Sequence, residues 1–403
     1  MLVVRIKYQM FSQGESGIKL GLKWTTMRTV RSVIILGIVA CLFVFKSYFD
    51  HAAWVIKSDS RRKYAGLPEI DNRKHPSPIV ILTYMRSGSS FVGDILQQSK
   101  DVFYLFEPLR LPQFAIRENK TYYSLNGDAR LYQMFLDAGS DIIRNWTRCN
   151  LFDLPNVTWE DSFLFKSNKA KILHACRVFQ SQHQSINQTL EYCVGMLVEA
   201  CFQSKYMVIK TIRLPIDTLM SLMEEFPSMK ILHLVRDPRA TVLAQIRFGM
   251  INPGSLAADA TDFCSRVYRD LISKDILANK FPGRILTFFY EDLAKNPLYM
   301  SKLLYKFTGV EYSPDIEKYV YDITLAGKNK DCGNLCTIKS NSSAEADLWR
   351  SKIDMKTARI IDQVCRPVYK RLGYREIKSE EMLTNNEIPL RLELQETDDY
   401  RYA

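Results

Sequence analysis

The sequence predicts a three-layer α/β domain with a central parallel β-sheet, preceded by a single N-terminal transmembrane helix. Short apolar, β-prone runs alternate with helical patterns, and right-handed crossovers between parallel strands then place helices on both faces of the sheet. With 403 residues and 47% hydrophobic composition, the chain can bury a large core. The expected strands are residues 79–83, 102–106, 206–213, 230–235 and 284–290.

The first 49 residues have the pattern of a signal anchor. Residues 1–32 hold six basic residues and one acidic residue, and the following run to Phe45 is uncharged and apolar. Thirteen helical residues span only about 20 Å of a hydrocarbon core of about 30 Å, but the span lengthens if Lys46 extends its amine to the interface. We therefore expect a cytosolic tail at 1–32, a transmembrane signal anchor at 33–49 and a luminal stem at 50–78. A buried soluble helix and a cleaved signal peptide remain alternatives.

Glycosylation sequons and cysteines agree with a luminal body. All five sequons follow the expected anchor, and they begin at Asn119, Asn145, Asn156, Asn187 and Asn341. Of nine cysteines, only Cys41 lies within the apolar run, which leaves eight for an oxidising lumen. Eight cysteines allow 105 pairings, and the sequence does not choose among them. Cys332 and Cys336 are the easiest local pair to imagine.

The loop after the first expected strand has the composition of an anion-binding turn. Gly88 permits a tight turn, and the serines around it stand at the start of a helix whose first amide groups have no partner. A Walker loop would need a longer turn ending in Gly-Lys-Ser/Thr, whereas here Arg86 precedes the turn. The loop is therefore expected to bind an oxyanion, and ATP is not the first candidate ligand. An ordinary strand-to-helix turn explains the same residues equally well.

Glu107 ends the second expected strand, and the proline after it favours an extended backbone. This would hold a carboxylate at the edge where open α/β sheets place their ligands, although a surface acid at a turn is an alternative. Helical spacing follows over residues 127–144. Residues 145–188 are irregular, and from their position alone we expect acceptor-binding loops there.

Arginines follow the strand at 230–235. Asp237 and Pro238 suit the start of a helix, but that role does not account for Arg236 and Arg239, which could grip a phosphate. Further helices are expected at 215–226, 261–279, 296–308 and 355–372. The final residues, 377–403, form an acidic-mixed tail of low expected structure.

Three motifs in order resemble the Golgi carbohydrate sulfotransferases, most closely the branch that sulfates the 6-hydroxyl of galactose, N-acetylgalactosamine or N-acetylglucosamine. They are TYMRSGSSF at 83–91, FYLFEPL at 103–109 and LVRDPRA at 234–240. The resemblance implies a P-loop-like sulfotransferase catalytic domain at 79–376 in a single-pass type II Golgi membrane protein. It implies sulfuryl transfer from 3′-phosphoadenosine 5′-phosphosulfate to a glycan or glycosaminoglycan, without a metal ion or nucleic acid. The oligomeric state stays open.

The resemblance also assigns roles to residues. The 5′-phosphosulfate would lie on Arg86, Ser87, Gly88, Ser89, Ser90 and Phe91. Arg236, with Arg239 nearby, would bind the 3′-phosphate together with a serine eight residues after Arg236, but Ala244 stands there. The missing hydroxyl should weaken nucleotide binding by about 1 kcal/mol, and Thr241 is a possible substitute. Glu107 would be the general base, and Arg86 would stabilise charge on the leaving group.

The last part of the resemblance is a basic, serine-containing loop, residues 339–343, followed by Trp349 and Arg350. In the family such a segment closes over the nucleotide, whereas a glycosylated surface loop beside a core tryptophan is an equal alternative. Sulfation of protein tyrosines is a further alternative within the same chemistry, and two other functions remain open for the whole chain. One is a non-catalytic nucleotide- or glycan-binding member of the fold, for which Ala244 is the hint. The other is a Golgi phosphotransferase, which would need metal-binding acids and usually a loop lysine.

Overall fold

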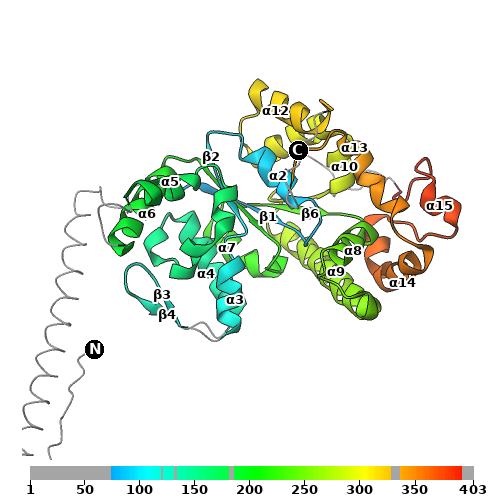
Figure 1. Ribbon diagram of the computed structural model, residues 1–403, viewed down its shortest axis with the longest axis horizontal. Coiled ribbons are helices and arrows are strands. Elements are labelled where there is room, and N and C mark those ends of the chain that lie inside the picture. The colour runs from blue at the N-terminus through cyan, green and yellow to red at the C-terminus, as the bar shows by residue number, and fades with distance from the viewer. Residues whose placement is uncertain (1–73, 119–120, 131–133, 181–185, 328–335, 393–403) are drawn as a thin grey trace, which may run out of the picture. The chain divides into compact units, whose positions relative to one another are not determined.

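Five parallel strands form the central sheet of the computed structural model, in the order β2-β5-β1-β6-β7 (Figure 1). The structure describes residues 74–118, 121–130, 134–180, 186–327 and 336–392. The strands are β1 (Ser77–Leu82), β2 (Val102–Phe106), β5 (Tyr206–Thr211), β6 (Lys230–Val235) and β7 (Ile285–Phe289). The predicted parallel sheet is confirmed, and each expected strand is present to within one or two residues at either end.

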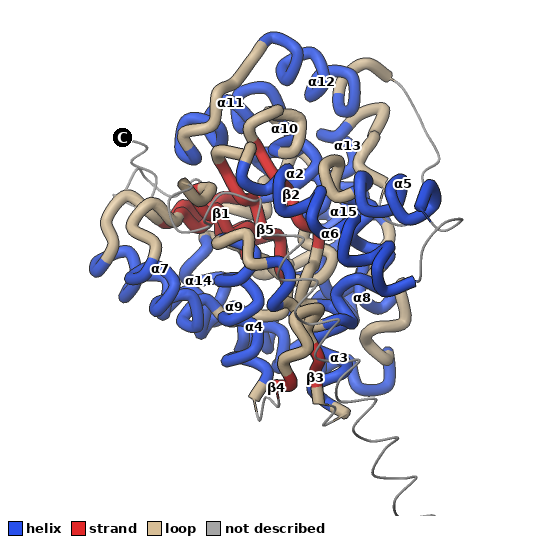
Figure 2. The backbone as a smooth tube through the Cα atoms, turned by 90° about the vertical axis from the view of Figure 1, so that its left-hand side faces the viewer, coloured by secondary structure: helices blue, strands red, loops and turns tan. Residues whose placement is uncertain are grey.

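Helices cover both faces of this sheet, as predicted (Figure 2). Figures 1 and 2 agree that α2, α10 and α12 lie on one face and α4, α7 and α9 on the other. The helices of the first half are α2 (Ser89–Leu96), α3 (Arg110–Arg117), α4 (Phe135–Thr147), α5 (Lys171–Gln180), α6 (Ile186–Phe202) and α7 (Met220–Glu225). Those of the second half are α8 (Pro238–Arg247), α9 (Leu256–Lys280), α10 (Tyr290–Lys295), α11 (Pro297–Thr308), α12 (Pro314–Thr324), α13 (Ser342–Asp347), α14 (Met355–Leu372) and α15 (Glu380–Thr384).

The strands are apolar throughout because both of their faces are buried. In β1, Ile79 and Ile81 pack with α2 and α11, whereas Val80 and Leu82 pack into the cluster that holds α4, α6 and α7. β1 pairs with β5 and β6, and its residue Ile81 lies opposite Lys210 of β5 and Leu232 of β6. The carboxyl ends of all five strands therefore meet at one edge, where the chain presents its loops.

The region between β2 and β5 differs most from expectation. The helix predicted over 127–144 begins only at Phe135, and β4 (Ala129–Arg130) precedes it, paired with β3 (Tyr122–Tyr123). The predicted acceptor loops at 145–188 contain three 3-10 helices between 151 and 166, followed by α5. Trp159 and Leu164 from this stretch are buried in the same cluster as Trp146. These residues therefore help to complete the core, and the expectation that the region binds the acceptor stays a prediction.

Three disulfides lie in the described part of the chain: Cys149–Cys201, Cys176–Cys193 and Cys264–Cys365. Cys336 is disulfide-bonded as well, but Cys332 lies outside the described residues. Among the sequon asparagines, Asn156 and Asn341 are exposed and Asn145 is half-buried. The side chains of Asn119 and Asn187 lie outside the described residues.

The predicted signal anchor at 33–49 and most of the stem lie outside the described residues. No helix in the described ranges combines the length and apolar character that a membrane span requires.

The expectation of a poorly structured tail is wrong for residues 377–392. They include α15, and Met382, Leu383 and Leu390 are buried in the cluster that also holds Trp349. The guanidinium group of Arg350 donates to main-chain carbonyls of this segment, at Met382, Leu383, Asn385 and Ile388. The segment is therefore part of the fold.

Candidate functional site

The loop between β1 and α2 is tightly turned, as its sequence predicts. Gly88 has φ 92° and Arg86 has φ 67°, both in the left-handed region. A Cβ atom on Gly88 would lie 2.2 Å from a ring carbon of Tyr290. Only glycine therefore combines this φ with this close approach.

Helix α2 begins at Ser89 without a capping side chain and without an acidic residue in its first turn. Its first amide groups and the positive end of its dipole therefore face the loop without a local anion. The Ser87 hydroxyl is buried beside them and has no hydrogen-bond partner among the described residues. An oxyanion in this loop would match these donors.

Two arginines lie together at this loop. Arg236, directly after β6, donates from Nη1 to the carbonyl of Arg86 at 3.0 Å, and its guanidinium stacks on the Tyr290 ring at 4.3 Å. The Arg86 guanidinium stacks on the Phe248 ring at 3.8 Å. Burial and the neighbouring charge of Arg236 both lower the pKa of Arg86. Such mutual repulsion would be relieved by an anion bound between the two side chains.

Glu107 is the carboxylate of the site, and two cations hold it. It is only 2% exposed, its φ is 53°, and it accepts a 2.5 Å hydrogen bond from Lys210 Nζ and a 3.1 Å hydrogen bond from Arg213 Nε. Arg213 also donates to Gln113 Oε1 at 2.5 Å. The extended backbone predicted for Glu107 is wrong, because the left-handed φ turns the chain directly into α3.

Lys210 and Arg213 were missed by the sequence analysis, which treated both as part of a strand. The sequence did contain a signal for Lys210, namely a lysine within an otherwise apolar strand. A buried cation needs an anionic partner, so this lysine could have indicated an ion pair. Burial lowers the pKa of Lys210, the Glu107 carboxylate opposes this shift, and the charges of Arg213 and Arg86 reinforce it. Arg86, Glu107, Lys210 and Arg213 therefore belong to one electrostatic cluster. Its cations, together with Arg236, come from β1, β5 and β6 at their carboxyl ends.

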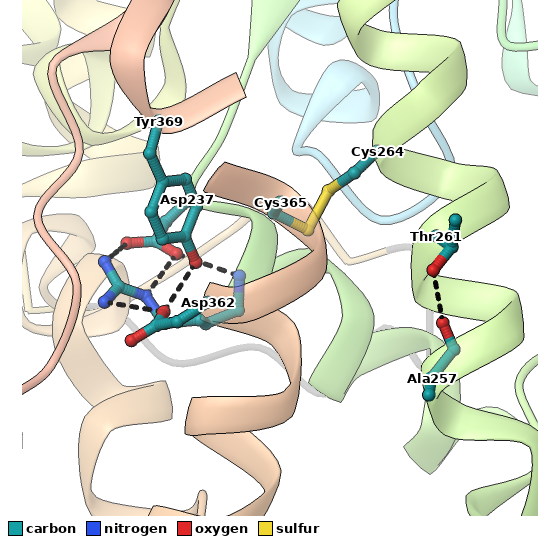
Figure 3. Close-up of a disulfide and its surroundings, with 8 residues drawn as sticks. Asp237, Ala257, Thr261, Cys264, Asp362, Cys365 and Tyr369 are labelled. Atoms are coloured by element: carbon teal, nitrogen blue, oxygen red, sulfur yellow. Dashed lines mark hydrogen bonds and ion pairs between the residues drawn. A yellow bond between two sulfur atoms is a disulfide. The ribbon is translucent and has the colours of Figure 1, made fainter. Parts of the chain in front are cut away.

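Arg239 does not join this cluster, which corrects its predicted contact with the 3′-phosphate. It is fully buried, its Nε and Nη2 donate to Asp237, and its Nη1 donates to Asp362 and to the carbonyl of Arg375. Figure 3 shows its partners Asp237 and Asp362, together with Tyr369, close to the Cys264–Cys365 disulfide. All of its donor groups are thus used inside the protein.

Ala244 lies half-buried on α8, one turn beyond Thr241. The Thr241 hydroxyl is buried and has no partner among the described residues. On the same helix, Gln245 Nε2 donates to the carbonyl of Met85 at 3.0 Å and fixes α8 against the loop. The region where a serine was expected therefore adjoins the loop but carries a methyl group.

The segment expected to close over a nucleotide is packed into the protein. Trp349 and Arg350 are buried, and Ser342 donates to the carbonyl of Ala294. Asn341 caps α13 by accepting from the amide of Ala344. Trp349 is therefore a core residue, and closure of residues 339–343 over a nucleotide stays a prediction.

A buried polar network lies next to the loop between β1 and α2. The Tyr84 hydroxyl donates to Asp270 at 3.0 Å and contacts His233 Nε2 at 3.0 Å. Burial, together with the charge of Lys274, lowers the pKa of His233 to about 3. His233 is therefore neutral at physiological pH. Within the described ranges, no group of three His, Cys, Asp or Glu residues is arranged to hold a metal ion.

The known proteins that resemble this chain are sulfotransferases. A sequence model of the sulfotransferase family matches residues 78–314. The chain is 25% identical over 382 residues to carbohydrate sulfotransferase 3 of Tetronarce californica, covering 84% of this chain and 83% of that protein. It is 28% identical over 355 residues to carbohydrate sulfotransferase 1 of Mus musculus, covering 79% of this chain and 84% of that protein. A similar solved structure is the sulfotransferase domain of a Synechococcus olefin synthase, with TM-score 0.43, 19% identity and coverage of 74% of this chain and 97% of that one.

Proposed function

The chain belongs to the sulfotransferase family, and from this premise we propose that it transfers the sulfuryl group of 3′-phosphoadenosine 5′-phosphosulfate to a sugar hydroxyl. The observation that carries the proposal is the cationic cluster at the carboxyl edge of the sheet. Lys210 and Arg213 hold the Glu107 carboxylate there, the charge of Arg86 acts on Lys210, and Arg236 donates to the carbonyl of Arg86. Relatives named carbohydrate sulfotransferases favour a sugar as the acceptor.

The donor groups of the loop fit the anionic part of this cosubstrate. Ser87 to Phe91 supply the buried hydroxyl and the uncapped start of α2 for the 5′-phosphosulfate. Arg236 Nε has no hydrogen-bond partner among the described residues and would be one donor to the 3′-phosphate. We no longer assign Arg239 to this phosphate, because its donors are occupied.

The proposed reaction is an in-line displacement at sulfur. The acceptor oxygen forms a bond to sulfur, the bond from sulfur to the oxygen of the 5′-phosphate breaks, and that oxygen leaves with 3′-phosphoadenosine 5′-phosphate. Arg86 and the loop amides stabilise the negative charge that develops on the leaving oxygen. The acceptor hydroxyl gives its proton to Glu107, whose oxygens at rest accept from Lys210 and Arg213.

The acceptor and the location complete the proposal. The 6-hydroxyl of galactose, N-acetylgalactosamine or N-acetylglucosamine, in a glycosaminoglycan or glycoprotein glycan, follows from the three sequence motifs. The basic N-terminal segment and the sequons support a type II Golgi membrane protein with a cytosolic tail at 1–32, an anchor at 33–49, a stem at 50–78 and a luminal catalytic domain from 79.

The test is transfer of labelled sulfate by the purified full-length chain to keratan, chondroitin and N-acetylglucosamine-terminated glycans. We expect transfer to one acceptor class and a loss of at least about 100-fold in Arg86→Ala, because charge on the leaving oxygen would lose a positioned donor. Near-normal transfer by Arg86→Ala would overturn the role given to Arg86. Nucleotide binding without transfer to any acceptor would identify a non-catalytic member of the family.

A further inference from the structure

We propose that a basic hollow beside helix α14 binds a linear sulfated polysaccharide, namely a part of the acceptor chain that is remote from the reacting sugar. This rests on the proposed function. The hollow consists of two adjoining cavities of about 310 and 380 Å³ between α14 and the segment 374–382. Both cavities are lined by Arg366, Glu376 and Lys378. They share these residues and therefore form one continuous depression.

Positive charge exceeds negative charge in the hollow. Its cations are Arg359, Arg366, Lys370, Arg375 and Lys378. Its two acids are already engaged, since Asp362 accepts from Tyr369 and contacts Arg239, and Glu376 accepts from Arg366 and Lys378. Arg359 and Lys370 form no ion pair with any carboxylate of the described residues. The hollow therefore keeps uncompensated cations.

These cations form a row and do not converge on one point. Arg359, Arg366 and Lys370 are separated by seven and four residues, so they share one face of α14 at intervals of about 10 and 6 Å along its axis. Arg375 and Lys378 stand on the chain segment that follows the helix. A row of this kind matches a polymer with repeated negative charges better than it matches one phosphate group.

The floor of the hollow is formed by packed aromatic and aliphatic side chains. Tyr369, Tyr374, Ile377 and Met382 line it and are themselves buried. Because they expose so little surface, the contacts to a polymer would come from the exposed cations around the hollow and not from its floor.

The hollow adjoins helix α8, which follows the proposed site in the chain. Asp362, in its lining, contacts Arg239 of α8 at 3.4 Å, and Arg236 lies two residues before α8 begins. The lining of the hollow shares no residue with the proposed site, so only a long acceptor chain would occupy both. Because each transfer adds negative charge to the acceptor, the hollow would favour chains that already carry sulfate.

The binding test uses the full-length chain and fluorescent chondroitin sulfate, with chemically desulfated chondroitin of equal length as the comparison. The variant Arg359→Gln/Lys370→Gln removes the two unpaired cations. The matched control Arg269→Gln/Lys306→Gln removes an arginine and a lysine that are exposed, form no ion pair with described residues and do not line the hollow. We expect the hollow variant to bind chondroitin sulfate about 5-fold more weakly, with a smaller salt dependence, and the control to stay within about 2-fold.

Equal losses in the two variants, or equal binding of sulfated and desulfated chains by the unmodified protein, would overturn the proposal. So would hollow-dependent binding of phosphatidylserine vesicles without binding of chondroitin sulfate. In transfer assays we expect the hollow variant to raise KM for long sulfated chains while KM for a disaccharide acceptor and for the nucleotide stay unchanged. A complete absence of transfer in the unmodified protein would refute the proposed function, and the binding comparison would still decide on the hollow.

Discussion

Replacing Glu107 by glutamine should destabilise the protein as well as remove the proposed base. Glu107 Oε1 is 2.5 Å from Lys210 Nζ, and Oε2 is 3.1 Å from Arg213 Nε. A glutamine amide has one oxygen and one NH₂ group, so one of the two cations would face a donor. Lys210 is the more vulnerable, because among the described residues Glu107 is its only hydrogen-bond acceptor, whereas Arg213 also reaches Gln113.

The magnitude follows from the burial of this pair. Lys210 is 4% exposed and Glu107 is 2% exposed, so Lys210 would remain in the interior without a counter-charge. Removing one partner of such a pair typically costs about 3–5 kcal/mol, a large share of the 5–15 kcal/mol that stabilises a domain. We therefore expect Glu107→Gln to lower the free energy of unfolding by about 3 kcal/mol. Adding Lys210→Met, which removes the unpaired charge, should recover at least about 2 kcal/mol.

The assay is urea unfolding followed by tryptophan fluorescence, since Trp146 and Trp159 are buried in the core. Sulfate transfer is then measured on each folded variant. A stable but inactive Glu107→Gln/Lys210→Met protein is the expected result, because the proton acceptor is gone. A loss below about 1 kcal/mol in Glu107→Gln would refute the argument that this carboxylate compensates a buried cation.

Three further predictions concern the loop and its support. Gly88→Ala should lower the free energy of unfolding in urea by about 2–4 kcal/mol, because alanine is strained at this positive φ and its Cβ atom would collide with Tyr290. Gly88→Ala/Tyr290→Ala should recover only the part of this loss that is due to the collision. Ala244→Ser should tighten nucleotide binding by up to about 10-fold in calorimetry, and no change would place the 3′-phosphate elsewhere. His233, with its pKa lowered to about 3, stays neutral in the folded protein while the unfolded chain binds a proton below about pH 6.5, so stability falls as pH decreases. Between pH 7 and pH 5, the free energy of unfolding of His233→Gln should therefore fall by about 2 kcal/mol less than that of the unmodified protein. Parallel plots of unfolding free energy against pH for the two proteins would contradict this role of His233.

The sheet and its edge could be predicted from the sequence because local signals determine them. Mostly apolar runs of five to eight residues identified the strands, and Gly88 identified the turn after β1. Asp237 and Pro238 identified the start of α8, where Asp237 caps the helix as expected. Each of these features depends on residues that are close together in the chain.

The remaining features depend on contacts between distant segments. Arg239 was taken for a phosphate ligand although its main partner, Asp237, is only two residues away, because the acceptors that complete its burial, Asp362 and the carbonyl of Arg375, lie 123 and 136 residues away in the sequence. Lys210 was overlooked because its partner Glu107 lies 103 residues earlier. Residues 151–166 lack a regular period because they form 3-10 turns, from which Trp159 packs against Trp146 of α4, and short turns of this kind carry no clear sequence pattern.

The C-terminal segment has a consequence for truncation. Arg350 is 3% exposed, and its hydrogen-bond acceptors are the carbonyls of residues between Met382 and Ile388. A chain ending at Glu376 would remove all of these acceptors, and it would uncover the apolar surface beneath Leu383 and Leu390. A boundary chosen where the sequence becomes polar would therefore yield an unstable and aggregation-prone protein. Expression designs should extend at least to Leu392, the last residue that the structure describes.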